Sequence, residues 1–551
     1  MSTPTDSHNI EPTNEGAQIP EQEDHLNAGN THALAHEQHP LPHAPLTLAH
    51  EQALERAEKA SGQLERARND RWYPTFHIAA RAGWINDPNG LCYFDGRYHA
   101  FYQHHPYGSA WGPMHWGHVS SADLVTWQRE RIALAPSIPA DQDGVFSGSA
   151  VEGPDGLLYV FYTGNRWLDG HADGRNEQTQ CLAVSEDGLT FHKEGVIIDA
   201  PGLPNFRDPK VWRQGVTWCM VLGATSEADR GQVHLYTSPD LRTWSFDRVL
   251  FEDPDPRVYM LECPDLFPLG GHWVLCYGPM TNARASGYAM RNGHNAGYVV
   301  GDWTLGSDFH PLTDYALSDW GSNYYAQQTF EAPDGRRIAL AWMGAFTLPL
   351  APQYSDNWSG QFTVPRELTL TEDLKLAATA LPELNGLECG RDTLGTFVLD
   401  ANRDRLLVDD GDAFAIDMVV DLSATTSEQV GLRVNETSDG SYTWVAYDDL
   451  ARRIVVDRRT KAGTDRGYRS APIDVDEGDS HLRMTVLVDR GSVEVFAGRN
   501  TATLSACAFP SEGKRRTSLS SISGIISVEE LTVRHFDSIY SDNGSNPRTM
   551  G

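Results

Sequence analysis

The chain is poor in positive charge and has no long apolar run. Its 44 Lys and Arg residues face 75 acidic residues, so the formal net charge is 44 − 75 = −31, which repels nucleic acid and anionic lipid. No basic residue precedes Arg56, and no stretch of about 18 apolar residues occurs that could form a membrane-spanning helix. We therefore expect a cytoplasmic protein that binds a neutral small molecule and neither nucleic acid nor membrane.

Cysteine is scarce and unpatterned. The seven cysteines are odd in number, scattered and without CxxC or His-rich spacing, which argues against a disulfide framework and a zinc site and fits a reducing compartment. Turn-forming residues are abundant instead, with 49 Gly and 31 Pro beside 40% apolar residues. This composition is typical of a turn-rich globular protein. Since domains usually comprise about 100–200 residues, the 551-residue chain should form at least two.

The two ends of the chain differ from its middle. Residues 1–45 are rich in acidic residues, histidine and proline, which predicts a disordered acidic tail, and the irregular histidine spacing favours a solvated tail over a metal site. Residues 46–71 have a thin apolar stripe at helical spacing, which predicts a helix. Residues 538–551 are polar and are predicted to form a loose C-terminal tail.

One supersecondary pattern recurs five times between residues 72 and 375. Each copy has a turn with proline and an acidic residue, a strand, a glycine turn and a strongly apolar strand. The apolar strands are expected at residues 98–102, 157–162, 217–222, 272–277 and 337–342. This spacing suits four-stranded propeller blades, which need about 40–50 residues each plus loops. We therefore predict an all-β fold that begins with a five-bladed β-propeller; a β-sandwich with unrelated turns is the alternative.

A second motif has the same phase as these repeats. The form S-x-D-x-x-T-aromatic occurs at residues 121–127, 185–191 and 238–244. We interpret the three copies as turns that lock the blades, because the Asp can bind nearby backbone N–H groups while the aromatic ring packs between sheets.

The repeat stops before the last third of the chain. A linker is predicted at residues 376–384, and residues 385–537 then alternate apolar and polar side chains. Two-sided alternation of this kind predicts antiparallel sheets packed face to face, so we expect a C-terminal β-sandwich domain.

Three acidic residues occupy equivalent positions in the repeat. Asp87, Asp208 and Glu262 each stand at the head of a blade's first strand, followed closely by proline. The first strand of every blade lines the central channel, so the three carboxylates should converge in one axial pocket. Crowded like charges raise at least one pKa, which is the arrangement that acid–base catalysis requires.

The residues expected around these acids suit a sugar. Rings can stack on a sugar face, while amides, a hydroxyl and a guanidinium bind its hydroxyls. The candidate pocket residues are Asn86, Gln103, Trp111, Phe146, Ser147 and Arg207. The implied reaction is glycoside cleavage, in which one carboxylate attacks the anomeric carbon and another, kept protonated by burial and a negative neighbour, protonates the leaving oxygen. No metal or organic cofactor is needed for these steps.

The same segments resemble the signature blocks of a known family. Residues 84–90 (WINDPNG), 207–209 (RDP) and 262–263 (EC) are similar to those of glycoside hydrolase family 32, the invertases, inulinases and β-fructofuranosidases. Further blocks at residues 102–103, 111–112, 146–149, 365–368 and 489–496 follow in the expected order. The resemblance covers about residues 72 to 535. It implies a five-bladed propeller followed by a β-sandwich, and retaining hydrolysis of β-D-fructofuranosides such as sucrose and fructo-oligosaccharides.

The resemblance also implies a role for each carboxylate. Asp87 would attack C2 of the fructosyl unit to form a covalent fructosyl-enzyme, and Glu262 would act as general acid and then as the base that activates water. Asp208 would bind the fructose 3- and 4-hydroxyls and stabilise the oxocarbenium-like transition state. In the fifth repeat, Tyr325 and Trp342 are candidates for contacts with the acceptor sugar.

Several alternatives stay open at this level. His104 and His105 either line the rim of the pocket or pack within a loop, and the packed interpretation is favoured. A non-catalytic sugar-binding propeller, a fructosyltransferase and a sialidase-like enzyme are the competing functions; the full carboxylate set argues against the first, and the lack of an arginine cluster and Tyr nucleophile against the last. The sequence does not decide among sucrose, sucrose phosphate, fructo-oligosaccharides and inulin, nor the oligomeric state, nor whether the sandwich braces the propeller or mediates self-association.

Overall fold

The computed structural model describes residues 48–172, 174–281, 287–459, 467–473 and 480–540. All of these belong to one compact unit, residues 43–551. The predicted disordered tail at residues 1–45 lies outside the described residues, as does the part of the predicted C-terminal tail after Tyr540. Among the described helices, none has the length and apolar content needed to cross a lipid bilayer.

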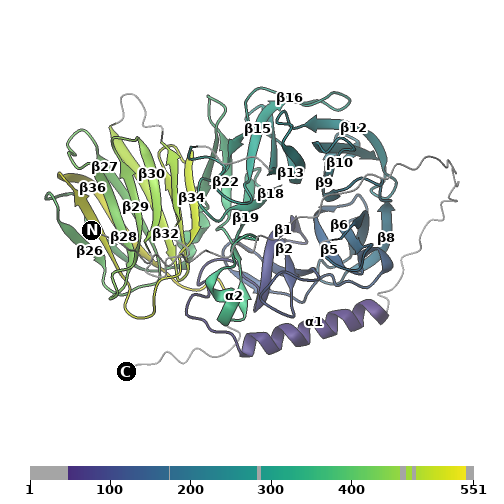
Figure 1. Cartoon of the computed structure of the whole chain (residues 1–551), viewed down its shortest axis with the longest axis horizontal. Coiled ribbons are helices and arrows are strands. Elements are labelled where there is room, and N and C mark those ends of the chain that lie inside the picture. Colours follow the sequence, from purple (N-terminus) through teal and green to yellow (C-terminus); the bar gives the residue numbers. More distant parts are fainter. Residues whose placement is uncertain (1–47, 173, 282–286, 460–466, 474–479, 541–551) are drawn as a thin grey trace, which may run out of the picture. The chain divides into compact units, whose positions relative to one another are not determined.

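Five sheets follow one another along the first two thirds of the described chain, and each is one blade (Figure 1). The first blade contains β1 (Gly83–Phe94), β2 (Arg97–His105), β3 (His115–Ser121), β4 (Trp127–Arg129) and β20 (Trp358–Ser359). The second contains β5 (Gly144–Glu152), β6 (Leu158–Trp167), β7 (Asn176–Ser185) and β8 (His192–Ile198). The third contains β9 (Phe206–Gln214), β10 (Thr217–Thr225), β11 (Gly231–Ser238) and β12 (Ser245–Glu252). The fourth contains β13 (Val258–Leu269), β14 (His272–Thr281), β15 (Gly297–Asp302), β16 (His310–Pro311) and β17 (Ala316–Leu317). The fifth contains β18 (Tyr325–Glu331), β19 (Arg337–Met343), β21 (Gln361–Phe362), β22 (Arg366–Leu370) and β23 (Leu376–Ala380).

The blades form a closed ring. The first strand of each blade contacts the first strand of the next, in the order β1, β5, β9, β13 and β18, and β18 returns to β1. A late segment also joins the first blade, since β20 pairs in parallel with β1. The predicted apolar strands are β2, β6, β10, β14 and β19, the second strand of each blade. The predicted five-bladed propeller is therefore confirmed.

The three S-x-D-x-x-T motifs connect the third and fourth strands of the first three blades. In each turn the Asp side chain accepts two backbone N–H bonds of 2.7 to 3.0 Å, at Asp123, Asp187 and Asp240. These turns are structural, as their repeated position indicates.

Every inner strand is interrupted by a β-bulge. The pairing register shifts between Ile85 and Pro88 in β1, between Phe146 and Gly148 in β5, at Asp208–Pro209 in β9, between Glu262 and Asp265 in β13 and between Tyr325 and Gln328 in β18. At three of the bulges a non-glycine residue has positive φ: Asp208 (67°), Cys263 (51°) and Ala326 (51°). A bulge bends a strand and turns a side chain to a new direction. The bulges thus determine which side chains of the inner strands face the axis.

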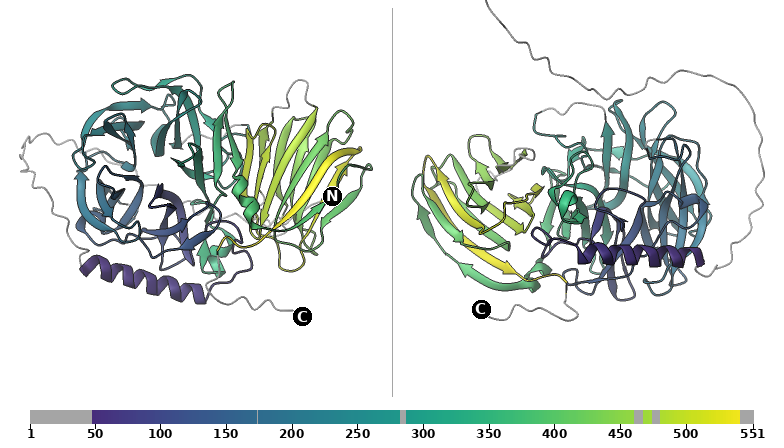
Figure 2. Two further views of the ribbon diagram at one scale, coloured as in Figure 1. Left: turned by 180° about the vertical axis from the view of Figure 1, so that it is seen from behind. Right: turned by 60° about the horizontal axis from the view of Figure 1, so that its bottom comes forward.

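The last part of the described chain is a β-sandwich (Figure 2). Its seven-stranded sheet contains β24 (Glu388–Thr393), β25 (Phe397–Leu399), β27 (Ala413–Asp421), β32 (His481–Asp489), β33 (Ser492–Ala497), β34 (Ala502–Cys507) and β36 (Ile526–Phe536). The six-stranded sheet contains β26 (Asp404–Val408), β28 (Gln429–Glu436), β29 (Tyr442–Asp448), β30 (Arg453–Arg459), β31 (Tyr468–Pro472) and β35 (Arg516–Ile522). Alternate residues of both sheets, such as Phe414, Leu432, Val445 and Val486, form one apolar core. The predicted sandwich is confirmed.

Two short stretches differ from the predicted boundaries. The predicted linker at residues 376–384 begins with β23, the outer strand of the fifth blade, and continues into the 3₁₀-helix η2 (Pro382–Leu387). This stretch pairs with β22 and is buried at its start, so it completes a blade. At the other end, Ile539 is buried and Tyr540 donates a 3.0 Å hydrogen bond to the Ala79 carbonyl. The first residues of the predicted loose tail are therefore packed on the propeller.

The predicted helix at residues 46–71 is present as α1 (Leu48–Arg66). Its apolar stripe packs Ala53, Leu54 and Ala57 against Ile132 and Ala135 in the segment that leads from the first blade to the second. The remaining helices among the described residues are short: η1 (Pro139–Asp141) and α2 (Ala351–Ser355).

Candidate active site

A cavity of about 380 Å³ lies where the inner strands of the first four blades meet. All three predicted carboxylates and all six predicted pocket residues line it. Its lining consists of Asn86, Asp87, Gln103, Trp111, Met114, Phe146, Ser147, Trp167, Ala172, Gly174, Asn176, Gln178, Asn205, Arg207, Asp208, Glu262, His294 and Phe346. The carboxylates of Asp87 and Glu262, which are 262 − 87 = 175 positions apart in the chain, thus share one pocket because the ring closes around it.

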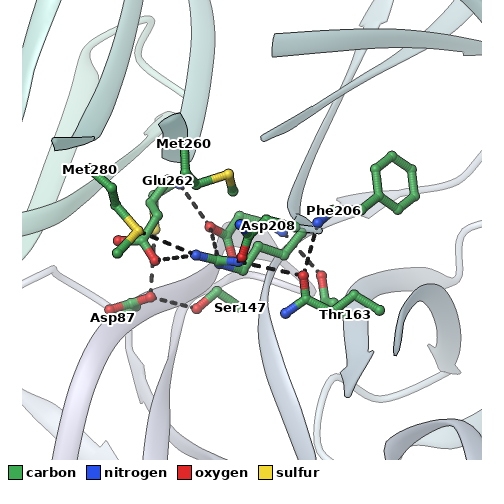
Figure 3. A network of polar contacts seen from close by, with 12 residues as sticks. Asp87, Ser147, Thr163, Phe206, Asp208, Met260, Glu262 and Met280 are labelled. Carbon is green, nitrogen blue, oxygen red and sulfur yellow. Dashed lines mark hydrogen bonds and ion pairs between the residues drawn. The ribbon is translucent and has the colours of Figure 1, made fainter. Parts of the chain in front are cut away.

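Asp87 accepts three hydrogen bonds at the bulge of β1, the longest of them from Cys263 Sγ to Oδ2 at 3.5 Å. Ser147 donates to its Oδ2 at 2.6 Å (Figure 3), and Asn86 donates to its Oδ1 at 3.0 Å. Burial raises the pKa of Asp87; the Ser147 and Asn86 bonds oppose this shift, while the negative charge of Glu262 adds to it. Asp87 therefore has a defined orientation and an ionised form that is costly to keep.

Asp208 is the most deeply placed of the three acids, with 6% of its surface exposed. Its Oδ2 accepts a 2.9 Å bond from the Cys263 backbone N–H. Burial raises the pKa of Asp208 to about 7; Arg207, whose Nε lies 3.9 Å from the carboxylate, opposes this shift, and the charges of Glu262 and Asp87 reinforce it. The positive φ at Asp208 is what turns this carboxylate toward its neighbours.

Glu262 is bound on both of its oxygens. Arg207 Nη2 lies 2.7 Å from Oε1, and the Tyr325 hydroxyl donates to Oε2. Arg207 is itself oriented by Asn205, whose Oδ1 accepts from Nη1 at 2.6 Å. Burial alone would raise the pKa of Glu262, but the charges of Arg207 and His294 and the hydrogen bond from Tyr325 outweigh it, so the pKa is lowered.

The expectation that burial and a negative neighbour keep Glu262 protonated is therefore wrong for this arrangement. The sequence placed an arginine next to Asp208, but only the fold shows that its guanidinium pairs more closely with Glu262, at 2.7 Å against 3.9 Å. The acids with raised pKa are Asp87 and Asp208. Because the three carboxylates interact, the proton that they retain belongs to the group as a whole.

Aromatic rings form one wall of the cavity. Trp111 and Phe146 meet edge to face with centroids 6.1 Å apart, and Phe146 and Trp167 do so at 6.4 Å. Gln103 is held by a 3.0 Å bond from its Nε2 to the Val145 carbonyl. A cavity lined by both aromatic rings and carboxylates suits a sugar, whose faces stack on rings and whose hydroxyls need hydrogen-bond partners.

Tyr325 and Trp342 lie elsewhere than the other candidates. Both line a second cavity of about 460 Å³, which shares His294 and Phe346 with the first. Both side chains are buried, and Trp342 packs on Trp84 with centroids 5.5 Å apart. Tyr325 reaches the site through its bond to Glu262, which the sequence did not indicate.

Several lining residues were not foreseen. Asn205 had a weak signal, because it lies two positions before the predicted Arg207 motif. Cys263 belongs to the predicted block at residues 262–263, but the sequence did not indicate that its backbone N–H binds Asp208. Gln178, Trp167 and His294 had none, since they come from loops and second or third strands of other blades. The two histidines of unresolved role differ in burial. His104 is 2% exposed, with its Nδ1 2.8 Å from the Trp84 carbonyl. His105 is partly exposed, with its Nδ1 2.8 Å from the Ala110 carbonyl.

Comparison with known proteins gives a consistent result. Residues 77–379 match the glycosyl hydrolases family 32 N-terminal domain, and residues 390–535 match the C-terminal domain of the same family. A sucrose-6-phosphate hydrolase of Escherichia coli is 40% identical over 474 residues, which is 86% of this chain and 96% of that protein. A raffinose invertase of Escherichia coli is 40% identical over 472 residues, 85% of this chain and 96% of that protein. The solved structure of a family 32 β-fructofuranosidase from Bombyx mori is similar with a TM-score of 0.78 and 30% identity, covering 89% of this chain and 100% of the other. The chain belongs to glycosyl hydrolases family 32.

Proposed function

We propose that the protein is a β-fructofuranosidase that hydrolyses terminal non-reducing β-D-fructofuranosyl units of sucrose and short fructo-oligosaccharides with retention of configuration. The observation that supports this most strongly is that three carboxylates and one guanidinium line, together with aromatic rings, one cavity of about 380 Å³. The names of the relatives, a sucrose-6-phosphate hydrolase and a raffinose invertase, support the same class of substrate.

Asp87 is the proposed nucleophile. The donors Ser147 and Asn86 each bind one of its oxygens, so the carboxylate is oriented before the sugar arrives. Attack of Asp87 on C2 breaks the glycosidic bond and forms the fructosyl ester. Water, which loses a proton to Glu262, then attacks C2 from the opposite face, the one that the leaving group vacated, and breaks the bond between C2 and Asp87. Two successive inversions give net retention.

Glu262 is the proposed general acid and base. It must carry a proton when the glycosidic oxygen leaves, although Arg207 favours its ionised form. The raised pKa of Asp87 and Asp208 indicates that one proton remains within the group near neutral pH. The reactive form has this proton on Glu262 and negative charge on the other two acids.

Asp208 is proposed to bind fructose hydroxyls and to stabilise the positive charge that develops on the sugar ring. Its ionised form is held in a buried site, where an electrostatic interaction is stronger than in water. Asp208 makes no covalent bond in this scheme. The chemistry of two carboxylates and water requires no metal or organic cofactor.

The reaction is proposed to take place in the cytoplasm. All seven cysteines are free thiols, and six of them are buried, which suits a reducing compartment. The net charge of −31 supports the expectation of a neutral sugar as partner and of no contact with nucleic acid or membrane.

Turnover of four substrates side by side tests the proposal: sucrose, sucrose 6-phosphate, 1-kestose and inulin. We expect near-equal release of glucose and fructose from sucrose. Kestose and longer oligomers as main products at high sucrose concentration would identify a transferase instead. With methanol as acceptor, the β-anomer of methyl fructofuranoside should form first, as followed by NMR; the α-anomer would contradict retention.

Two variants test the assigned roles. Asp87→Ala and Glu262→Gln should each lower kcat on sucrose by about a thousandfold or more, because each removes a group needed in the transition state. With a fructoside that has an activated aryl leaving group, Glu262→Gln should form the ester rapidly and hydrolyse it slowly, so mass spectrometry should find a fructosyl adduct on Asp87. Azide should restore its turnover. Glu252→Gln, at an exposed ion pair of the third blade, is the matched control and should be fully active.

A further inference from the structure

The segment that precedes the fifth inner strand lies on the sandwich. This seam segment, residues 318–323, is hydrogen-bonded to β34. Trp320 N–H donates to the Thr503 carbonyl at 2.8 Å, Asn323 N–H donates to the Ser505 carbonyl at 3.0 Å, and the Thr503 hydroxyl donates to the Ser318 carbonyl at 2.9 Å. Because β34 is the terminal strand of its sheet, the seam segment continues the sandwich sheet with residues that belong to the propeller.

The contact is too close for any side chain at its centre. A Cβ on Gly321 would lie 2.0 Å from the Ser505 carbonyl oxygen. The neighbouring Asn323 is bonded in two directions, since its Oδ1 accepts from Cys507 N–H at 3.0 Å and its Nδ2 donates to the Gly344 carbonyl at 3.1 Å. The position of the seam segment is therefore set by the sandwich backbone.

A buried ion group reinforces the contact. Asp319 Oδ2 lies 3.0 Å from Arg366 Nη1, and Arg366 Nη2 pairs with Glu494 of β33. All three side chains are at most 4% exposed. Asp319 Oδ1 also accepts the N–H groups of Gly321 and Ser505 at 2.7 and 2.8 Å. Buried ion groups add little to stability relative to apolar packing, and they are best attested as devices that specify one arrangement.

The seam segment leads directly into the active site. Two residues after Asn323, the Tyr325 hydroxyl donates to Glu262 Oε2. Tyr325 packs closely, because a Cβ at Gly278 would lie 2.7 Å from its ring, and His294 meets it edge to face at 5.2 Å. A shift of the seam segment would therefore move the hydroxyl relative to Glu262.

We propose that the β-sandwich is a positioning element for catalysis: Asp319, anchored by Arg366 and Glu494 and seated on β34, sets the Tyr325 hydroxyl against the acid–base residue Glu262. The inference rests on the proposed role of Glu262. It gives the sandwich a part in the reaction that goes beyond bracing the propeller.

The readout is the pH dependence of kcat/KM, which follows the protonation of Glu262 on its alkaline side. The charged and titratable groups that face Glu262 are Arg207 and Asp208 from β9, Asp87 from β1, Tyr259 and Cys263 from β13, Tyr325 from β18 and His294. Of these, Tyr325 is the group that the seam segment positions. Loss of the hydrogen bond from Tyr325 to the carboxylate should raise the pKa of Glu262 and shift the alkaline limb of the kcat/KM profile to higher pH.

Three variants perturb the seam by different means. Asp319→Asn removes a charge, Gly321→Ala introduces a clash with Ser505, and Thr503→Val removes one hydrogen bond while leaving every charge in place. We expect kcat on sucrose to fall by about 10- to 100-fold for the first two and less for the third, as for a misplacement of about 1 Å. All three should move the alkaline limb in the same direction as Tyr325→Phe does.

The control is Trp72→Phe, which removes a different buried bond to the sandwich, that from Trp72 Nε1 to the Pro510 carbonyl at 2.8 Å. It should leave both kcat and the alkaline limb unchanged. In a Tyr325→Phe background, the seam variants should cause no further shift of the limb, because they act through the hydroxyl that is already absent.

Either of two results would overturn the inference. In the first, the seam variants fold, as judged by near-ultraviolet circular dichroism, and keep the wild-type kcat and alkaline limb. In the second, the seam variants still shift the alkaline limb in the Tyr325→Phe background. If Asp319→Asn or Gly321→Ala does not fold, Thr503→Val decides. An inactive wild-type protein on all four substrates would instead refute the proposed function, so the two failures are distinguishable.

Discussion

Replacing Asp208 by Asn should make the protein more stable above neutral pH while it lowers activity. The pKa of Asp208 rises from 3.8 in its ordinary state to about 7 in the fold, because burial and the charges of Glu262 and Asp87 outweigh the opposing charge of Arg207. The folded protein therefore binds this proton more tightly than the unfolded chain. The contribution of Asp208 to stability therefore falls as pH rises from about 4 to about 7 and is constant above that.

The magnitude follows from the size of the shift. About three pKa units at about 1.4 kcal/mol each correspond to about 4 kcal/mol, which is the upper limit for the cost of ionised Asp208 at pH 8. Asn removes that cost, and it suits the site in two ways: it tolerates the φ of 67° better than most residues, and its carbonyl can still accept the Cys263 N–H bond. The substitution should cost little in packing.

Urea unfolding of wild-type and Asp208→Asn proteins at pH 4, 6 and 8 measures the effect. The difference in free energy of unfolding should be near zero at pH 4 and should rise to a few kcal/mol in favour of the variant at pH 8. On sucrose, kcat should fall severely, since a neutral amide cannot stabilise the positive charge of the transition state.

Asp255→Asn is the matched control of opposite sign. Hydrogen bonds from Arg257 lower the pKa of Asp255 to about 2 at the surface, so this variant should lose stability above pH 4. If the Asp208→Asn difference is the same at pH 4 and pH 8, or if the variant is the less stable protein at pH 8, the electrostatic description of the site is wrong.

Two further substitutions test the active site and the contact of His77 with the sandwich. Ser147→Ala removes a hydrogen-bond donor that lowers the pKa of Asp87, so the acidic limb of the kcat/KM profile should move to higher pH. The control is Ser149→Ala on the same strand, where the native hydroxyl accepts from the Val211 N–H of β9; this variant should leave the limb in place. An unmoved limb in Ser147→Ala would show that Asp87 does not determine that limb. Burial alone would lower the pKa of His77, but two carboxylates of the sandwich, each 2.8 Å away, raise it to about 9. The stability that His77 contributes, at most about 3 kcal/mol, is therefore fully present below pH 6.5 and is lost between pH 6.5 and 9. The free energy of unfolding of the wild-type protein in urea should decline across this window, and His77→Gln should lack that decline. Equal slopes for the two proteins would contradict the proposed ion pairing of His77 with the two carboxylates.

The fold could be predicted because its repeat is local. Each blade has its own apolar second strand and its own turns, so five copies of one pattern gave the propeller with the correct phase. The placement of Asp87, Asp208 and Glu262 followed from the same phase, since equivalent positions of a ring face a common axis. The short strand β23 was missed because small residues such as Ala377 and Ala378 give it a weak strand signal, and its partner β22 decides its structure.

The sequence by itself determined that Asp87, Asp208 and Glu262 meet: a periodic chain places equivalent side chains at equivalent points, and that requires only local pattern and ring closure. Tertiary structure alone decided how they interact. The pairing of Arg207 with Glu262, the raised pKa of Asp87 and Asp208, and the hydrogen bond from Tyr325 to Glu262 depend on distances of a few ångströms between separate blades. Electrostatic and hydrogen-bond energies change steeply over such distances, whereas the hydrophobic pattern that builds the blades does not depend on them.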